Sequence, residues 1–315
     1  MISGILPIVK PAGMTSASAV LNAKILIGET RIGHSGTLDP NAAGVLPIAL
    51  GRATRLIEYM DAPFKTYRCE CTLGVQTPTD DIWAEITGGI RLSAPWSAEL
   101  MPARERIAEV LESFVGVSEQ LPPAYSSVRV NGRHLYQYAR SGEEVAVKPR
   151  RIEIRAMKLI SLDAVRGTFL FDIECSRGTY VRTVCREIGE RLGGMGACMS
   201  CLIRTSCCGF SIGECVTFEQ LAASEDPSSL LLPAERAAEG LRRAFIGSSF
   251  HERLFCGGNP VNVKKARAEL PEDAAEGEPL AVFGAEKGFL GVAERKAEED
   301  GFLLKPVKIT YDGPL

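Results

Sequence analysis

Residues 31–55 read RIGHSGTLDPNAAGVLPIALGRATR. The first ten residues hold two glycines and an Asp-Pro pair, which are typical of a loop rather than a helix or strand. Residues 44–50 predict a buried strand and residues 52–60 a short helix. A carboxylate in such a loop, here Asp39, is a candidate nucleophile, general base or metal ligand. The alternative is a turn in which Asp39 only accepts a backbone N–H.

The segments around this loop predict an α+β protein. Helices are expected at residues 15–27, capped by Thr15 and ended by Gly28, and at 103–114 and 179–192. Strands are expected at 67–75, 151–160 and 168–175, and the Asn131-Gly132 pair predicts a hairpin. Helices and strands do not alternate regularly, so we expect a mixed or antiparallel sheet rather than a doubly wound parallel one.

The last third of the chain has a different composition. Thr217 and Gln220 predict a capping box for a short helix, and residues 222–241 are rich in Ala, Ser, Glu and Pro, as in a linker. Short strand-like runs follow at 280–283, 289–292 and 302–304. We therefore expect one domain over residues 1–240 and a small β-rich domain over 241–315.

The bulk composition indicates a soluble globular protein. The 315 residues are 45% hydrophobic and 24% charged, and no apolar run approaches the roughly 20 residues that span a bilayer. The start of the chain lacks the features of a signal peptide, so a cytoplasmic location is expected. The 10 cysteines are expected to be reduced thiols. A metal site at Cys198, Cys201, Cys207 and Cys208 is not favoured, because adjacent strand residues such as the last two point to opposite faces.

The charge distribution points to a nucleic acid despite a net charge of −3. Between residues 124 and 158, basic residues outnumber acidic ones, and such a surface can hold a phosphate backbone. The candidate RNA-binding residues are Arg129, Arg133, Arg140, Lys148, Arg150 and Arg151. The alternative is a solvated charged face.

Two further segments could carry chemistry. Residues 176–182 lie between a strand end and a helix start, where Arg182 could pair with a carboxylate; the alternative is an exposed helix arginine. Tyr67, at a strand start, could stack on a base or move a proton, or lie in the core. Neither a dinucleotide fingerprint nor a phosphate-binding loop is present, and the three histidines follow no metal-ligand pattern, so no cofactor and no metal are expected.

In their order along the chain, several of these segments resemble the TruB family of pseudouridine synthases. The run at 31–55 matches the family's catalytic motif, and residues 10–16 match its N-terminal motif. Further matches lie at 65–67, 73–74, 122–127, 136–140, 175–183 and 202–205. The similarity covers about residues 4–220, with a looser likeness to a PUA-like domain at the C-terminal end. Val9, residues 77–84, Ile203 and Ser206 depart from the family pattern.

The resemblance implies a fold and a reaction. The fold would be that of a pseudouridine synthase: a mixed, mainly antiparallel sheet flanked by helices, with a thumb-like RNA-binding insertion at about 124–152. The reaction would isomerise uridine 55 in the T-arm of tRNA. Separately, we expect a monomer, because RNA binding by one cleft needs no symmetry. Asp39 would attack uracil C6 or sugar C1′, or initiate loss of a C2′ proton. The residue roles implied are Asp39 as catalytic aspartate, Arg182 as its salt-bridge partner, Tyr67 as the residue that stacks on the uracil, His34 as the residue that fills the gap left by the flipped base, and Tyr180 and Leu202 as pocket residues.

Other functions stay open on the sequence. A non-catalytic RNA-binding or tRNA-folding protein on the same scaffold would need the basic segment but not Asp39. A carboxylate-based hydrolase would need a second carboxylate, for which Asp80 and Asp81 are candidates. A related uridine in another RNA is the third alternative.

Overall fold

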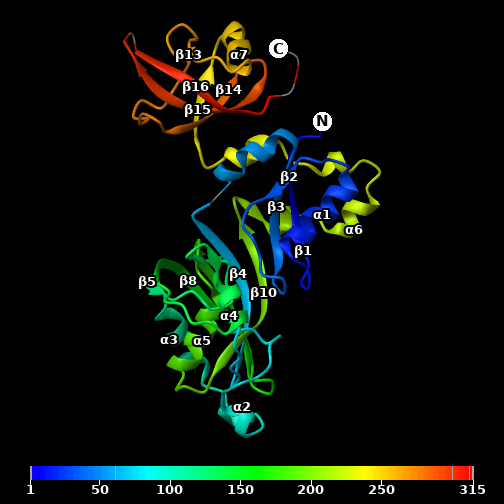
Figure 1. Ribbon diagram of the computed structural model, residues 1–315, viewed down its shortest axis with the longest axis vertical. Coiled ribbons are helices and arrows are strands. Elements are labelled where there is room, and N and C mark those ends of the chain that lie inside the picture. Colours follow the sequence, from blue (N-terminus) through cyan, green and yellow to red (C-terminus); the bar gives the residue numbers. More distant parts are fainter. Residues whose placement is uncertain (1, 61, 300, 312, 314–315) are drawn as a thin grey trace. The chain divides into compact units, whose positions relative to one another are not determined.

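The computed structural model describes residues 2–60, 62–299, 301–311 and 313. They form two compact units (Figure 1). The terminal unit comprises Met1–Ala62 and Ser206–Leu315, and the central unit comprises Pro63–Thr205. The shorter elements of the chain include α2 (Ile90–Ser93), η2 (Ala98–Leu100), β11 (Phe210–Ser211), η3 (Ile212–Glu214) and β13 (Val261–Asn262).

The terminal unit is built on an antiparallel strand pair that is buried on both faces. Strand β1 (Gly4–Lys10) pairs with β3 (Ala43–Leu50), from Gly4 opposite Leu50 to Lys10 opposite Gly44. Alternate residues point to opposite faces, so one face packs on α1 (Ser16–Ile27) and α6 (Phe218–Ala223). The other face packs on η1 (Gly51–Tyr59) and η5 (Ala234–Ala238). Burial of both faces explains why residues 44–50 are apolar without alternation.

Helix α1 begins and ends where the sequence predicted. The Thr15 hydroxyl accepts the N–H of Ser18 at 3.0 Å, which satisfies a donor that the helix leaves open. Gly28 ends the helix at φ 77°, a conformation that glycine adopts without steric cost. The predicted short helix after β3 is the 3₁₀ helix η1, and the capping box of Thr217 and Gln220 is present at α6.

The C-terminal part of the terminal unit is rich in strands, as predicted. Five strands are ordered β12 (Arg242–Ile246), β14 (Pro279–Gly284), β15 (Gly288–Glu298), β16 (Gly301–Ile309) and β13, and α7 (Ser249–Cys256) packs with them. In Figure 1 this sheet is coloured from yellow to red. The domain division near residue 240 and the PUA-like character stay predictions.

The linker predicted over residues 222–241 is wrong. The segment forms the 3₁₀ helices η4 (Pro227–Leu230) and η5, and Leu232 exchanges two backbone hydrogen bonds with Ile5. Ala237 is buried in the core beside β1 and β3. Small residues such as alanine look linker-like in composition, yet here they allow η5 to pack closely on the sheet.

The central unit contains an antiparallel sheet, as expected. Strands β4 (Phe64–Leu73), β9 (Thr168–Ser176), β8 (Arg150–Asp163) and β5 (Gly116–Gln120) are neighbours in that order. Phe169, Phe171, Ile173 and Cys175 alternate onto the buried face, as the sequence predicted. Helix α5 (Val181–Arg191) packs on β4, α3 (Arg104–Glu112) packs on β8, and the two helices contact each other. Strand β10 (Ala197–Cys207) leads back to the terminal unit.

The basic segment forms a small substructure between β5 and β8. The predicted hairpin consists of β6 (Arg129–Val130) and β7 (Arg133–His134), and α4 (Leu135–Ser141) follows it directly. Asn131 and Gly132 both have positive φ, 50° and 83°, as a two-residue turn of this kind requires.

Candidate active site

Asp39 lies in the turn between two paired strands of the terminal unit. Strand β2 (Ile32–His34) pairs with β3, with His34 opposite Ile48, so His34 is in a short strand and not in a loop as predicted. The chain then leaves the sheet, and the Ala42 N–H donates to the Asp39 carbonyl at 3.1 Å. The backbone turn therefore uses the main chain of Asp39. The Asp39 side chain is half-buried, and the chain on both sides of Asp39 is held in place.

Ser16 fixes the residue before Asp39. Its side chain is only 3% exposed. The Ser16 hydroxyl accepts the Leu38 N–H at 3.0 Å and donates to the Leu38 carbonyl at 3.2 Å. One hydroxyl thus satisfies both polar groups of a buried peptide segment, and it ties the start of α1 to the loop of Asp39.

Lys10 and Gly13 fix the residue after Asp39. The Lys10 ammonium is fully buried and donates to the carbonyls of Pro11 at 2.8 Å, Met14 at 2.6 Å and Pro40 at 3.1 Å. The Gly13 N–H also donates to the Pro40 carbonyl, at 3.0 Å. A buried ammonium is tolerated when its three donors find acceptors, and here those acceptors belong to the two loops on either side of the site.

Four other predicted site residues lie in the central unit. Tyr67 is half-buried on β4, opposite Ile173 of β9. Leu202 is buried on β10, and Tyr180 is the residue before α5. Asp39 and Arg182 belong to different units, and their predicted pairing stays a prediction, as do the roles of these residues.

Arg182 is buried, so the alternative of an exposed helix arginine is wrong. Its side chain is 6% exposed. The Nη1 group donates to the Thr79 carbonyl at 3.0 Å and the Nη2 group to the Tyr125 carbonyl at 3.1 Å. The planar guanidinium therefore has a fixed orientation, which is what a two-pronged contact with a carboxylate requires.

A titratable carboxyl lies close to Arg182. Asp80 Oδ2 is 3.6 Å from Arg186 Nε. Burial raises the pKa of Asp80 to about 6, although the charges of Arg186 and Arg182 act in the opposite direction. Asp80 follows Thr79, whose carbonyl holds Arg182, so this carboxyl belongs to the surroundings of Arg182.

Gln120 makes a contact with Tyr180 that the sequence did not suggest. Its Oε1 accepts the Tyr180 N–H at 2.8 Å and its Nε2 donates to the Tyr180 carbonyl at 3.2 Å. A glutamine at the end of a strand carries no pattern that predicts this contact. Ser16 was also missed as an anchor of Asp39; a second hydroxyl directly after the helix cap was its only signal.

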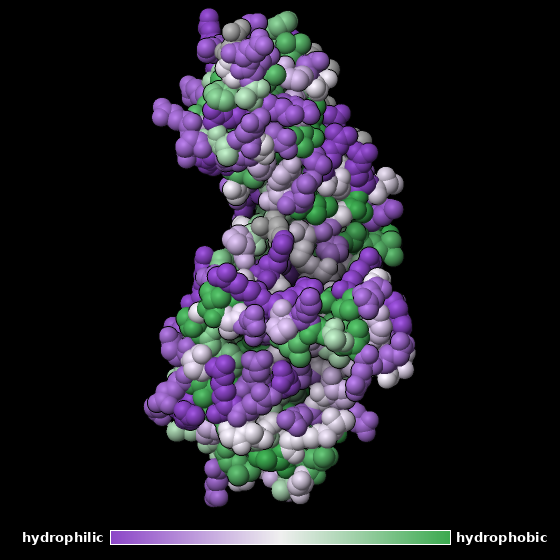
Figure 2. Space-filling model, turned by 60° about the vertical axis from the view of Figure 1, so that its left-hand side comes forward, coloured by the Kyte–Doolittle hydropathy of each residue, from purple (hydrophilic) through white to green (hydrophobic). Residues whose placement is uncertain are grey.

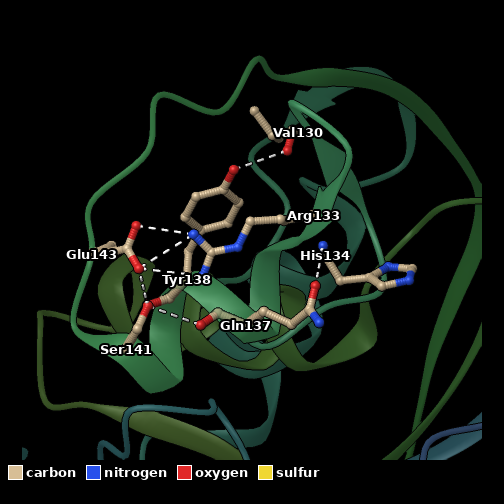
Figure 3. A network of polar contacts seen from close by, with 7 residues as sticks. All are labelled: Val130, Arg133, His134, Gln137, Tyr138, Ser141 and Glu143. Atoms are coloured by element: carbon tan, nitrogen blue, oxygen red, sulfur yellow. Dashed lines mark hydrogen bonds and ion pairs between the residues drawn. The ribbon is translucent and has the colours of Figure 1, made fainter.

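The basic segment has its own network of polar contacts (Figure 3). Arg133 Nη1 lies 3.1 Å from Glu143 Oε2, and its guanidinium stacks over the Tyr138 ring at 4.4 Å. The Tyr138 hydroxyl donates to the Val130 carbonyl at 3.1 Å. Arg133 therefore braces the hairpin against α4, and its charge is largely balanced by Glu143.

All six predicted RNA-binding side chains are exposed: Arg129, Arg133, Arg140, Lys148, Arg150 and Arg151. Arg140 lies over the Tyr136 ring at 5.4 Å, and that ring stacks on His134 at the same centroid distance. Hydrophilic residues predominate on the face drawn in Figure 2. Exposed cations beside aromatic rings suit a nucleic acid backbone with unstacked bases.

The cysteines contradict one expectation. Cys207 and Cys208 do not point apart, because Cys208 adopts φ 57° and the two sulfurs lie 3.3 Å from each other. Among the described residues, no group of three or more His, Cys, Asp or Glu side chains is arranged to hold a metal ion. No helix in the described part of the chain is long and apolar enough to cross a membrane.

Comparison with known proteins decides the family. Residues 24–181 match the TruB family pseudouridylate synthase (N terminal domain). The tRNA pseudouridine synthase B of Bacillus subtilis (strain 168) is 39% identical over 318 residues, which cover 98% of each chain. The chain belongs to the TruB family of pseudouridine synthases. The Streptococcus gordonii tRNA pseudouridine synthase B is 41% identical over 313 residues, 98% of this chain and 99% of that protein.

Solved structures agree with this family in their fold. A chain of an H/ACA RNP bound to a substrate RNA containing 2′-deoxyuridine aligns with a TM-score of 0.71 at 21% identity, over 98% of this chain and 85% of that one. A chain of a Cbf5-Nop10-Gar1 complex aligns with a TM-score of 0.69 at 22% identity, over 97% and 84%. The predicted α+β pseudouridine synthase fold is therefore confirmed, and this TruB-family protein is an enzyme.

Proposed function

We propose that this enzyme converts uridine 55 in the T-arm of tRNA to pseudouridine, with the Asp39 carboxylate as its nucleophile. The relatives named tRNA pseudouridine synthase B support tRNA as the substrate. The main support for Asp39 is the anchoring of its loop. Hydrogen bonds from buried side chains reach Leu38 through Ser16 and Pro40 through Lys10, on the two sides of Asp39.

Anchoring of this kind matters because the reaction needs a correctly placed group. Isomerisation breaks the N-glycosidic bond, rotates the uracil and forms a bond to C5, without redox change or group donor. The carboxylate adds to uracil C6, attacks sugar C1′ or initiates loss of the C2′ proton, and each route needs it within bonding reach of the nucleotide. A displacement of about 1 Å can cost roughly 100-fold in rate. The Arg182 guanidinium aims Asp39 at the nucleotide.

The target uridine must leave its stack before it can react. Extruding a base costs a few kcal/mol. Stacking on Tyr67 offsets roughly 1–3 kcal/mol of that cost. His34 fills the space that the base leaves, and Tyr180 and Leu202 line the uracil pocket.

The basic segment holds the RNA backbone. Five of the six predicted RNA-binding residues contact phosphates: Arg129, Arg140, Lys148, Arg150 and Arg151. The sixth, Arg133, mainly keeps the hairpin on α4.

The 241–315 part is a PUA-like domain that follows the 1–240 catalytic domain. One cleft per chain needs no symmetry, so the enzyme acts as a monomer in the cytoplasm; a stable dimer in light scattering would contradict this.

The proposed function is tested by mapping the position at which pseudouridine forms in the RNA. An unmodified tRNA transcript is incubated with the enzyme, and its pseudouridines are mapped by chemical labelling and primer extension. We expect one stop, at position 55, and none in a transcript with cytidine at that position. Conversion of another uridine would refute the position. Binding without conversion of any uridine would refute the reaction and favour the tRNA-folding alternative.

A further inference from the structure

Gln120 holds the backbone of Tyr180 at two points. It is the last residue of β5 and its side chain is only 3% exposed. The Oε1 atom accepts the Tyr180 N–H at 2.8 Å, and the Nε2 group donates to the Tyr180 carbonyl at 3.2 Å. A peptide N–H can only donate and a carbonyl can only accept, so both atoms of the amide have one possible assignment.

The position of Tyr180 makes this contact important. Tyr180 precedes α5, and its own side chain forms no capping hydrogen bond. The Tyr180 carbonyl also accepts the Val184 N–H at 3.2 Å, which begins the helix. Two residues before it, Gly178 has φ 86°, so the approach to Tyr180 is a turn rather than regular structure. Gln120 supplies the polar contacts that the turn does not.

The same contact sets the start of the helix that carries Arg182. Arg182 is the second residue of α5, and its guanidinium reaches the Tyr125 carbonyl at 3.1 Å. Gln120 and Tyr125 both belong to the segment that leads from β5 into the basic insertion. Tyr180 and Arg182 are therefore attached to this one segment by three hydrogen bonds.

We propose that Gln120 is a positioning residue for catalysis, which sets the place of the Tyr180 ring in the uracil pocket through the Tyr180 backbone. The proposal rests on the proposed function, because that function gives Tyr180 its place in the pocket. Without the two hydrogen bonds, the Tyr180 backbone loses its fixed position and the ring no longer confines the flipped uracil. Gln120 is buried, so RNA affinity is unaffected while the chemical step slows.

The experiment compares Gln120→Met with the wild-type enzyme. Methionine has nearly the same length as glutamine but offers neither the acceptor nor the donor. We expect kcat at saturating tRNA to fall about tenfold and Kd for tRNA to stay within about threefold. Amide hydrogen exchange at Tyr180 should quicken, while exchange in β8 and β9 stays as in the wild type.

A double-mutant cycle separates positioning from a general structural effect. If Gln120 acts through Tyr180, Gln120→Met should lower kcat by less than about threefold in a Tyr180→Ala background. Gln220→Met is the matched control, because the Gln220 Oε1 accepts the Thr217 N–H at the same distance of 2.8 Å, at the start of α6. This control should keep kcat within about twofold of the wild type.

Three results would overturn the proposal: unchanged exchange at Tyr180 in Gln120→Met, a loss confined to Kd, or the same fold-loss of kcat with and without the Tyr180 ring. Failure of the proposed function has a different signature. If the wild-type enzyme modifies another uridine, kcat in the double-mutant cycle is measured for conversion of that uridine. If it modifies none, exchange at Tyr180 still decides whether Gln120 holds the backbone, and an absent effect there refutes the proposal.

Discussion

Ser16→Ala tests how far the placement of Asp39 depends on one buried hydroxyl. The substitution removes the acceptor of the Leu38 N–H and the donor to the Leu38 carbonyl, which lie at 3.0 and 3.2 Å from Oγ. Leaving a buried polar group without a hydrogen bond costs about 1–3 kcal/mol. The two groups share one site and relax together, so we expect the free energy of unfolding to fall by roughly 2–4 kcal/mol.

The effect on catalysis follows from the neighbouring residue. Leu38 precedes Asp39, and release of its backbone lets the carboxylate move away from the bound nucleotide. A shift of up to 1 Å corresponds to a fall in kcat of roughly 10- to 100-fold. Urea unfolding followed by circular dichroism measures stability, and single-turnover conversion at saturating tRNA measures the chemical step. Ser16→Cys, which keeps a weaker donor and acceptor, should lie between wild type and Ser16→Ala.

Ser18→Ala is the matched control for this prediction. Ser18 lies on the same helix, but its side chain is exposed and its hydroxyl contacts the Thr15 hydroxyl at 2.8 Å. We expect its stability to stay within about 0.5 kcal/mol of the wild type and its kcat to be unchanged. The reasoning is refuted if Ser16→Ala loses stability but keeps the wild-type kcat, because the hydroxyl would then support the fold without placing Asp39.

Two further predictions concern charge. Because burial raises the pKa of Asp80 from 3.8 to about 6, its ionised form destabilises the folded state above pH 6 and this cost disappears below pH 4. At pH 7.5 the free energy of unfolding of Asp80→Asn should therefore exceed that of the wild type by on the order of 2 kcal/mol, and this difference should vanish towards pH 4. Urea titrations across this pH range measure the difference. A difference that stays constant with pH would contradict the prediction. For RNA binding, Arg150→Gln should reduce the slope of log K against log salt by about one phosphate contact, whereas Arg133→Gln should reduce it less, because Glu143 already balances Arg133. Equal slopes for the two variants, from binding titrations at several salt concentrations, would refute the division of roles.

Local signals in the sequence predicted much of the fold. The Thr15 cap, the Gly28 stop and the Asn131-Gly132 turn are short-range features, and each is present as predicted. The alternation from Phe169 to Cys175 also follows from local strand geometry. These features depend on residues a few positions apart, which is why a single sequence is enough to find them.

The errors arose where contacts distant in the chain decide the structure. The segment at 222–241 is low in large apolar residues, but pairing with Ile5 and burial of Ala237 order it. One error is local instead: Cys208 adopts a left-handed backbone, which strand alternation does not allow for. The alternative of an exposed Arg182 fails because carbonyls of Thr79 and Tyr125 accept its N–H groups, and neither residue lies near it in sequence.

The candidate site divides in the same way. A resemblance carried by ordered motifs named Asp39, Tyr67 and Arg182, and their roles stay predictions. The residues that hold them in place were harder to find. Ser16 and Gln120 act on backbone groups of other residues, and such contacts have no signature in composition or periodicity. Positioning residues therefore become visible only once the chain is folded.

The most direct test of the central claim is tritium release from a T-arm stem–loop labelled at C5 of the target uracil, with wild-type enzyme and Asp39→Asn side by side. Transfer of the glycosidic bond to C5 releases this tritium, so the readout reports the reaction itself. Asparagine has the same shape as aspartate but lacks the charge. We predict release by the wild type, none above background by Asp39→Asn, and equal binding of the stem–loop by both. Release by both proteins would contradict the account, because Asp39 would then not be the nucleophile.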